Sequence, residues 1–320
     1  MARNEKLKQF ERSLGRHALI GMRWLFNRMP YGLYRALTIF FILIGKVALI
    51  KKRQTAVESL RKAFGREKSE KELKHIAGAC FENFGRGMVD LIYFIDRPQK
   101  LKDNIRFEGK EHLDKALALG KGAILVSAHF GNFIMLYYRM VLEGYKTNVI
   151  MRRVRDAEFE KYISQFRDER GIGTIYDLPS RKCVVDSLKA LRNNEILFIL
   201  LDQNYGSDGR VFVDFFGHPA ATAAGPVVFG NRTGAPILPA FIMQDNAGGA
   251  IDKHKIVIDP QVFLDNVGDD HANIVHNVAK LTKIIEHYIR LYPHEWGGWM
   301  HKRWKSRLIE EQTAIDAAAA

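Results

Sequence analysis

A histidine at the end of an apolar run is the first candidate for chemistry in this chain. His129 follows small residues and precedes Gly131, where an apolar segment (122–125) gives way to helical spacing (133–142). In α/β sheets, functional groups lie at such strand-to-helix junctions. Imidazole titrates near neutral pH and can act as a general base. The alternative is a buried histidine whose nitrogens are satisfied by hydrogen bonds, and the junction alone leaves both interpretations open.

Two further polar stretches begin where an apolar strand is expected to end. In the basic cluster 151–156, Arg152 and Arg155 could clamp a phosphate or a carboxylate. A solvated helix start is the alternative for this cluster. The very apolar run 195–201 is followed by an acid and two amides at 202–204, which could orient a base or hold a polar substrate. The alternative for this second stretch is an ordinary turn.

Periodicity predicts that these stretches belong to a three-layer α/β fold. From about residue 103 onward, apolar runs alternate with longer segments of helical spacing, a pattern typical of a sheet with helices on both faces. Strands are expected at 105–109, 122–125, 145–151, 173–176, 195–201, 236–243 and 255–258. Helices are expected at 111–119, 133–142, 157–170, 181–193 and 270–291.

The N-terminal third is predicted to be helical and to associate with a membrane. Residues 1–30 mix cations with aromatic and aliphatic side chains, as an interfacial helix requires. An apolar stretch, 33–50, follows, and its uncharged core is shorter than the roughly 20 residues that span a bilayer. A membrane-embedded helix and a buried core helix both fit this stretch. We expect a helical membrane-anchoring region over 1–100 and an α/β domain over 101–310.

Charge and composition limit the classes of partner. The chain has 49 Lys and Arg against 36 Asp and Glu, a net charge of +13, which favours nucleic acid, an anionic bilayer or a phosphorylated substrate. Signatures of nucleic-acid modules are absent, so nucleic-acid binding rests on charge alone. The two cysteines and the spacing of the histidines predict neither a disulfide framework nor a metal site.

Several blocks of sequence together point to a known family. In chain order they are His-Phe-Gly-Asn-Phe (129–133), Asp-Gln-Asn-Tyr-Gly (202–206), Phe-Phe-Gly (215–217), Ala-Thr (221–222), Gly-Pro (225–226), Thr-Gly-Ala-Pro (233–236) and Trp-Met-His-Lys-Arg-Trp-Lys (299–305). The chain resembles the lipid A biosynthesis acyltransferases, the lauroyl and myristoyl transferase group, which is related to the phosphatidylinositol mannoside acyltransferases. The resemblance runs from about residue 20 to residue 307.

This resemblance implies a membrane-bound O-acyltransferase with an αβα sandwich, working without a cofactor at the cytoplasmic face of a bacterial inner membrane. The donor would be a thioester of acyl carrier protein or coenzyme A, and the acceptor a hydroxyl of a glycolipid or lysolipid. By the family's pattern His129 would be the general base, and Arg152 matches its arginine. The residues expected to contact substrate are Asn132, Arg152, Arg155, Gln203, Thr222 and Gly225.

One position departs from the family's pattern, which is His, four residues, then Asp or Glu. Ile134 stands at the acid position and cannot orient an imidazole. We predict that Asp202 replaces the missing acid, because it too should lie at a strand end beside His129. The alternative is that the chain is a catalytically inactive or lipid-binding relative.

Overall fold

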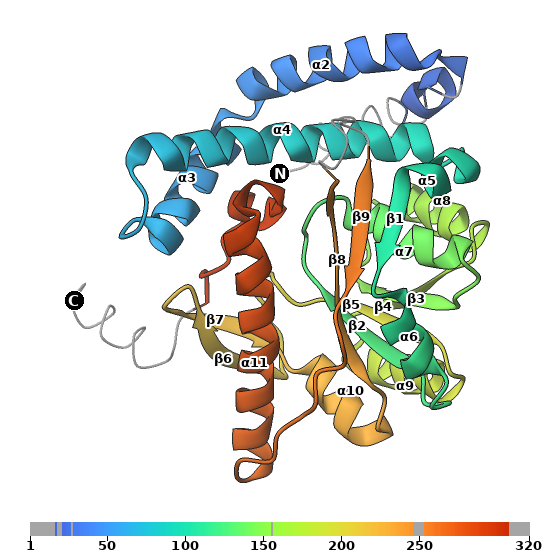
Figure 1. Cartoon of the computed structure of the whole chain (residues 1–320), viewed down its shortest axis with the longest axis vertical. Helices are drawn as coiled ribbons and strands as arrows, with labels where there is room; N and C mark the ends of the chain where they lie inside the picture. Colours follow the sequence, from blue (N-terminus) through green and yellow to red (C-terminus); the bar gives the residue numbers. More distant parts are fainter. Residues whose placement is uncertain (1–16, 18–20, 27, 155, 246–252, 307–320) are drawn as a thin grey trace, which may run out of the picture.

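The computed structural model describes residues 17, 21–26, 28–154, 156–245 and 253–306 (Figure 1). Its centre is a seven-stranded sheet with the order β1 (Ile105–Glu108), β9 (His254–Ile258), β8 (Ile237–Gln244), β2 (Ala123–Ser127), β5 (Ile196–Leu200), β3 (Thr147–Met151) and β4 (Ile172–Tyr176). The strands from β8 to β4 run parallel to one another. β9 pairs antiparallel with β8, and β1 pairs parallel with β9. The sheet is therefore mixed but mostly parallel.

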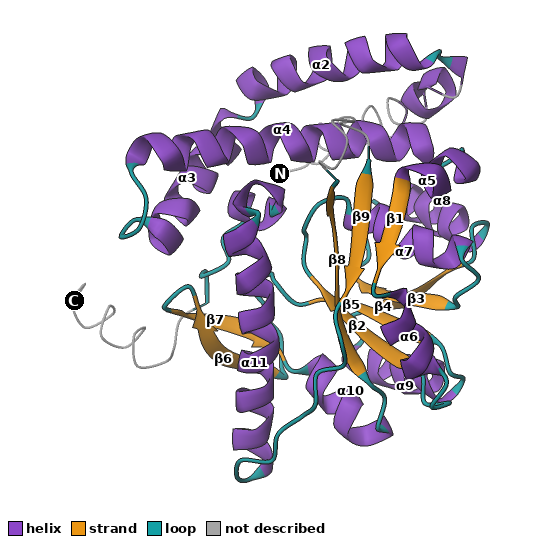
Figure 2. Ribbon diagram, viewed as in Figure 1, coloured by secondary structure: helices purple, strands orange, loops and turns teal. Residues whose placement is uncertain are grey.

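Helices cover both faces of the sheet (Figure 2). Buried residues of one face share a core with α5 (Pro98–Asn104), α6 (Lys110–Leu117) and α7 (Phe133–Leu142), and α8 (Ala157–Asp168) packs against this core. Residues of the other face share a core with α9 (Ser180–Arg192), α10 (Gly225–Thr233) and α11 (Asp270–Leu291). The two cores on either side of one sheet form the three-layer arrangement that the periodicity predicted.

The connections explain why a crevice forms at the ends of β2 and β5. The chain leaves β2 through α7 on one face, moves outward through β3 and β4, and returns to β5 through α9 on the other face. A right-handed crossover that reverses direction must change face. Beyond β5 the chain stays on the α9 face. Neighbouring strands whose chains depart to opposite faces leave an opening at their carboxyl ends, where ligands bind in such sheets.

The expected strands and the expected helices are present with small shifts at their ends, and α7 and α11 have the predicted bounds. Sequence patterns missed α5, α10, a hairpin of β6 (Arg210–Phe215) and β7 (His218–Ala223), and the 3-10 helices η1 (Pro293–Glu295) and η2 (Gly297–Met300). The hairpin turns through Phe216 and Gly217, whose φ angles are 55° and 75°. Two positive φ angles are typical of the tightest hairpin turns.

The N-terminal helices lie along one side of the α/β domain, with α2 (Tyr31–Ala48) beside α4 (Glu70–Phe94) (Figure 1). Ser-Glu-Lys-Glu at 69–72 has the spacing of a capping box, and Ser69 and Glu72 exchange hydrogen bonds at the start of α4. α3 (Ile50–Phe64) and α4 contribute to the core shared with α11, whereas α2 buries only a narrow stripe. Its exposed apolar side chains are Leu33, Ile39, Phe40, Phe41, Leu43 and Ile44.

The described helices differ in length and in how apolar they are. None of them is by itself long and apolar enough to cross a bilayer. Two neighbouring segments, Gly32–Gly45 and Ile50–Phe64, satisfy the length and composition criteria together, with a bend of 78° between them.

Candidate active site

His129 and Asp202 meet at the carboxyl ends of β2 and β5. The two strands are adjacent and parallel, and their register pairs Ser127 with Leu200. Each functional residue comes two positions after its member of that pair, so the strands place the two side chains at the same level. The Nδ1 atom of His129 lies 2.9 Å from Oδ1 of Asp202. The structure therefore brings together the two residues that the sequence placed at separate strand ends.

The carboxyl group of Asp202 is completely buried and has a second hydrogen-bond donor. The indole N–H of Trp296 donates to its Oδ2 atom at 2.7 Å. Burial alone would raise the pKa of Asp202, but the charge and hydrogen bonds of His129 and the bond from Trp296 outweigh burial and lower the pKa below its ordinary value. Asp202 is thus held as a carboxylate aimed at the imidazole.

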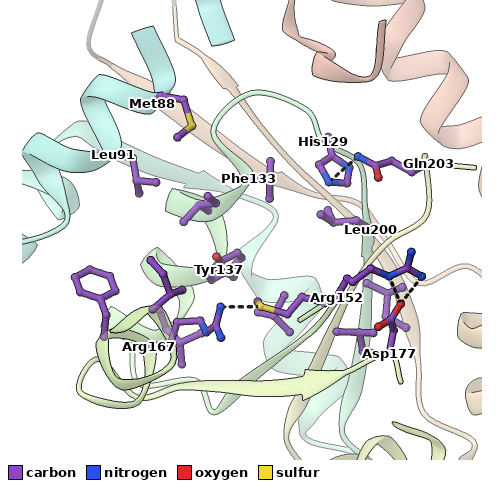
Figure 3. Close-up of a pocket in the computed structure, with 18 of the residues that line it drawn as sticks. Met88, Leu91, His129, Phe133, Tyr137, Arg152, Arg167, Asp177, Leu200 and Gln203 are labelled. Atoms are coloured by element: carbon purple, nitrogen blue, oxygen red, sulfur yellow. Dashed lines mark hydrogen bonds and ion pairs between the residues drawn. The ribbon is translucent and has the colours of Figure 1, made fainter. Parts of the chain in front are cut away.

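The second nitrogen of His129 faces the amide of Gln203. The Nε2 atom of the ring lies 3.1 Å from the amide nitrogen of Gln203 (Figure 3). An amide nitrogen can only donate, so Nε2 is the acceptor. The ring proton is then on Nδ1 and is donated to Asp202. This tautomer leaves on Nε2 the lone pair that a general base uses.

The loop after β2 is fixed by backbone contacts. Gly131 has a φ of 52°, and a Cβ atom at this position would approach the backbone oxygen of Ile242 to 2.1 Å, so only glycine fits. The backbone N–H of Gly297 donates to the backbone oxygen of His129 at 2.8 Å. This pairing holds the segment that carries Trp296 against the loop, and it explains how Trp296 reaches Asp202.

An apolar cavity of about 640 Å³ opens beside His129 (Figure 3). Its walls come from α4, α7 and α8 and from the ends of β3 and β5. The lining is mainly aliphatic and aromatic, and its polar groups include His129, Gln203, Arg152 and Arg167. A cavity of this size and character suits an extended apolar ligand. Ile134, at the position where the family carries an acid, lines the cavity.

The other predicted site residues fall into two groups. Arg152 and Gln203 line the cavity, and the largely exposed guanidinium group of Arg152 pairs with Asp177 at 2.8 Å. Asn132, Thr222 and Gly225 do not line it. The prediction for Arg155 lies outside the described residues.

Asn132 and Thr222 are occupied within the protein. The amide of Asn132 caps α7 at the backbone N–H of Met135 and donates to the backbone oxygen of Gly87 in α4, at 2.7 Å. The hydroxyl of Thr222 is buried and accepts from Arg303 at 2.6 Å. These bonds occupy the polar atoms of both side chains within the protein, and the predicted substrate contacts of Asn132 and Thr222 stay predictions.

Sequence reasoning missed the hydrogen bonds that Trp296 and Arg303 make to the residues around the site. The guanidinium group of Arg303 is buried, and burial lowers its pKa to about 10. It donates to the backbone oxygens of Gln203 and Ala221, and so fixes the loop after β5 against the hairpin. The only available signal was the run of aromatic and basic residues at 299–305, which by itself assigns no role. Within the described ranges, no group of His, Cys, Asp or Glu side chains has an arrangement that could hold a metal ion.

Comparisons with known proteins identify a family. The model of the bacterial lipid A biosynthesis acyltransferase family matches residues 3–306. A lipid A biosynthesis lauroyltransferase of Escherichia coli is 24% identical over 294 residues, which cover 90% of each chain. A phosphatidylinositol mannoside acyltransferase of Mycobacterium tuberculosis is 27% identical over 208 residues, covering 64% of this chain and 62% of the relative.

A solved structure is also similar, but at a low level. The 1-acyl-sn-glycerophosphate acyltransferase PlsC of Thermotoga maritima aligns over 77% of this chain and 98% of its own, with 13% identity and a TM-score of 0.37. The family match, by contrast, spans nearly the entire sequence. The chain therefore belongs to the bacterial lipid A biosynthesis acyltransferase family, and it is an acyltransferase.

Proposed function

We propose that the chain transfers a fatty acyl group from a thioester, carried by acyl carrier protein or coenzyme A, to a hydroxyl of a glycolipid or lysolipid, with His129 as the general base and Asp202 as its orienting acid. The observation that carries this proposal is the 2.9 Å contact between the two side chains beside a large apolar cavity. The cavity would hold the acyl chain, with its thioester carbon next to Nε2 of His129.

The reaction follows from the hydrogen bonds around the ring. The acceptor hydroxyl displaces the Gln203 amide from Nε2 and gives its proton to that nitrogen as its oxygen attacks the thioester carbonyl carbon. The new C–O bond gives a tetrahedral intermediate, which collapses with cleavage of the C–S bond. The imidazolium returns its proton to the leaving thiolate. Asp202 stabilises the imidazolium while it exists, and the released Gln203 amide can donate to the carbonyl oxygen as negative charge develops there.

An isoleucine at position 134 is consistent with activity, because Asp202 and not residue 134 contacts the imidazole of His129. Its side chain lines the apolar cavity, where it adds to the surface that contacts an acyl chain. Asp202 already occupies Nδ1 of His129, so the imidazole has an acid without a carboxylate at 134. An inactive relative would have no need of Asp202, a buried carboxylate whose pKa is lowered and which contacts His129. Such buried, perturbed groups are typical of functional sites, and this favours an active enzyme.

We further propose that the N-terminal region, 1–100, anchors the α/β domain, 101–310, at the cytoplasmic face of a bacterial inner membrane. α2 presents a row of exposed apolar side chains to solvent, and an apolar patch of this kind marks a contact with membrane or protein. Phe84 and Met88 of α4 are also exposed, and Met88 lines the cavity. A lipid acceptor could thus reach His129 from the bilayer surface.

The test is acyl transfer by the full chain in lipid vesicles with a radiolabelled thioester donor and extracted membrane lipids as acceptors. His129→Ala is expected to lower the rate of labelled lipid formation by at least about 10²-fold. The matched control is His276→Ala, which removes a second histidine paired with an aspartate, His276 with Asp265 at 3.0 Å, on an exposed surface. Equal rates for the wild type and His129→Ala would refute the role of His129.

A further inference from the structure

The cavity also has polar groups on the side away from His129. Arg167 lines the cavity there, and its side chain is only 7% exposed. One Nη atom donates to Glu160 at 2.9 Å and to the hydroxyl of Tyr176 at 3.5 Å, but the other donates only to the thioether sulfur of Met151, also at 2.9 Å. Its Nε atom is buried and has no hydrogen-bond partner. A thioether is a weak acceptor, so this guanidinium group has more donors than good acceptors.

The separation between His129 and Arg167 lies within the length of an extended acyl chain. His129 follows β2, and Met151 ends β3, which lies two strands away in the order β2, β5, β3. Two strand spacings amount to roughly 10 Å. A group bound to Arg167 would therefore sit well along a chain whose thioester is at His129. Figure 3 shows Tyr137 between the two residues in that view.

Tyr137 adds a second unused polar group to the same region. It is buried, lines the cavity, and is close enough to Arg167 for the guanidinium charge to act on its pKa. Within the described part of the chain, its hydroxyl has no hydrogen-bond partner, and its ring packs edge-on against Phe198. An unbranched hydrocarbon chain would leave this hydroxyl and the surplus donors of Arg167 unsatisfied away from water, which is unfavourable.

We propose that the acyl group that this cavity accepts carries a hydroxyl oxygen, alcoholic or phenolic, at or near its far end. This inference rests on the proposed function, which places the thioester at His129. The oxygen would accept from the Nη atom of Arg167 in place of the Met151 sulfur and share a hydrogen bond with Tyr137. A hydroxyl fits better than a carboxylate because Glu160 already balances the charge of Arg167, and a second anion would be buried without a cation of its own.

Binding of donor analogues to the full chain, without an acceptor, tests this inference. The probes are N-acetylcysteamine thioesters of dodecanoic, ω-hydroxydodecanoic and ω-carboxyundecanoic acids, measured by calorimetry in detergent. The ω-hydroxy thioester is expected to bind about tenfold more tightly than the dodecanoyl thioester. Tyr137→Phe, which removes a single oxygen, is expected to reduce this preference several-fold. The matched control is Tyr138→Phe on the same helix, which does not line the cavity and should keep the preference.

The outcomes separate the two proposals. Equal or tighter binding of the plain dodecanoyl thioester overturns the inference while leaving the acyl site intact, and so does a preference that survives Tyr137→Phe unchanged. Tightest binding of the ω-carboxy thioester overturns the choice of a hydroxyl. If none of the three thioesters binds, the cavity is not an acyl site, and the proposed function fails together with the inference.

Discussion

Among the described residues, two His–Asp pairs have nearly equal N···O distances but lie in different surroundings. His129 and Asp202 are 2.9 Å apart at the ends of β2 and β5, and the carboxylate side chain is completely buried. His276 and Asp265 are 3.0 Å apart beside α11, with both side chains more than 40% exposed. Distance alone does not distinguish them.

What differs is the set of groups around each aspartate. The second side-chain donor to Asp202 is a neutral indole N–H, and no lysine or arginine among the described residues hydrogen-bonds to this carboxylate. Asp265 accepts from Lys280 at 2.9 Å, and this bond lowers its pKa more than the bond to His276 does. Water screens the exposed pair, whereas the first pair also faces an apolar cavity. A His–Asp pair is therefore a candidate for catalysis when its carboxylate is buried, is not shared with a lysine or arginine, and lies beside a cavity.

The largest expected effect follows from changing the buried aspartate. Asp202→Asn removes the charge that stabilises the imidazolium and can turn its amide N–H toward Nδ1, which favours the wrong tautomer. We expect the turnover number for acyl transfer to fall by about 10²–10⁴-fold. The measurement is steady-state transfer of labelled acyl groups to extracted lipids.

Asp265→Asn is the control for that change, because it makes the same substitution in the exposed pair. Its turnover number should equal that of the wild type. Full turnover by Asp202→Asn, or an equal loss in the two variants, would remove the distinction between the pairs and the role proposed for Asp202.

A third acid, Glu295, shows how burial changes the pKa of a carboxyl group that is not paired with a histidine. Its side chain accepts from the backbone N–H of Gln244, and burial raises its pKa to about 7. The folded protein therefore keeps this proton between about pH 4.5 and pH 7, while the unfolded chain loses it, so stability falls as pH rises through that range. The expected loss from this group is about 3 kcal/mol.

Glu295→Gln should remove this contribution. Denaturant unfolding at pH 5 and pH 8 should show a difference in the free energy of unfolding that is smaller by about 3 kcal/mol in the variant than in the wild type. The exposed Glu158→Gln should leave the wild-type difference unchanged. An identical pH dependence in Glu295→Gln and wild type would show that Glu295 keeps its ordinary pKa in the folded state.

Ile134→Glu restores the acid of the family's pattern. It tests whether residue 134 serves as part of the apolar cavity wall or as the acid that orients His129. The new carboxylate would lie in the apolar cavity, where a charge without a partner is unfavourable. We expect kcat/KM for a long-chain donor to fall about 10- to 100-fold, mainly through KM. Ile134→Leu, which keeps the apolar surface, should stay within a few-fold of the wild type. A rise in turnover of Ile134→Glu would show that His129 lacks an adequate acid.

The sequence predicted most of the helices and strands because the patterns that indicate them involve residues close together in the chain. The helix over 133–142 and the capping box at Ser69 depend on neighbouring residues only, and both are present. The hairpin of β6 and β7 was missed because β7 is rich in alanine, which is uncommon in strands. Its turn is further supported by a distant contact, since Glu286 accepts from the backbone N–H of Phe216 at 2.8 Å.

For the site, the sequence indicated the strand ends but not the partners that come from far along the chain. The contact of His129 with Asp202 could be anticipated because two strand ends in a parallel sheet meet at one edge. Trp296 could not, since its position depends on the pairing of Gly297 with the backbone of His129. Asn132 was expected to contact substrate, but its short amide is used to join α7 to α4.

The smallest effect is expected from Arg152, which pairs with Asp177 at the cavity wall but whose own side chain is mostly exposed. Arg152 thus lies at the same cavity as His129, but its side chain is exposed like those of His276 and Asp265. Because exposed ion pairs contribute less than about 1 kcal/mol, Arg152→Ala should leave the free energy of unfolding nearly unchanged. If its guanidinium group contacts the donor equally in the ground and transition states, KM for the thioester should rise about threefold at constant kcat. A fall in kcat as large as that of Asp202→Asn would mean that location at the cavity, rather than burial of the pair, determines which residues take part in catalysis.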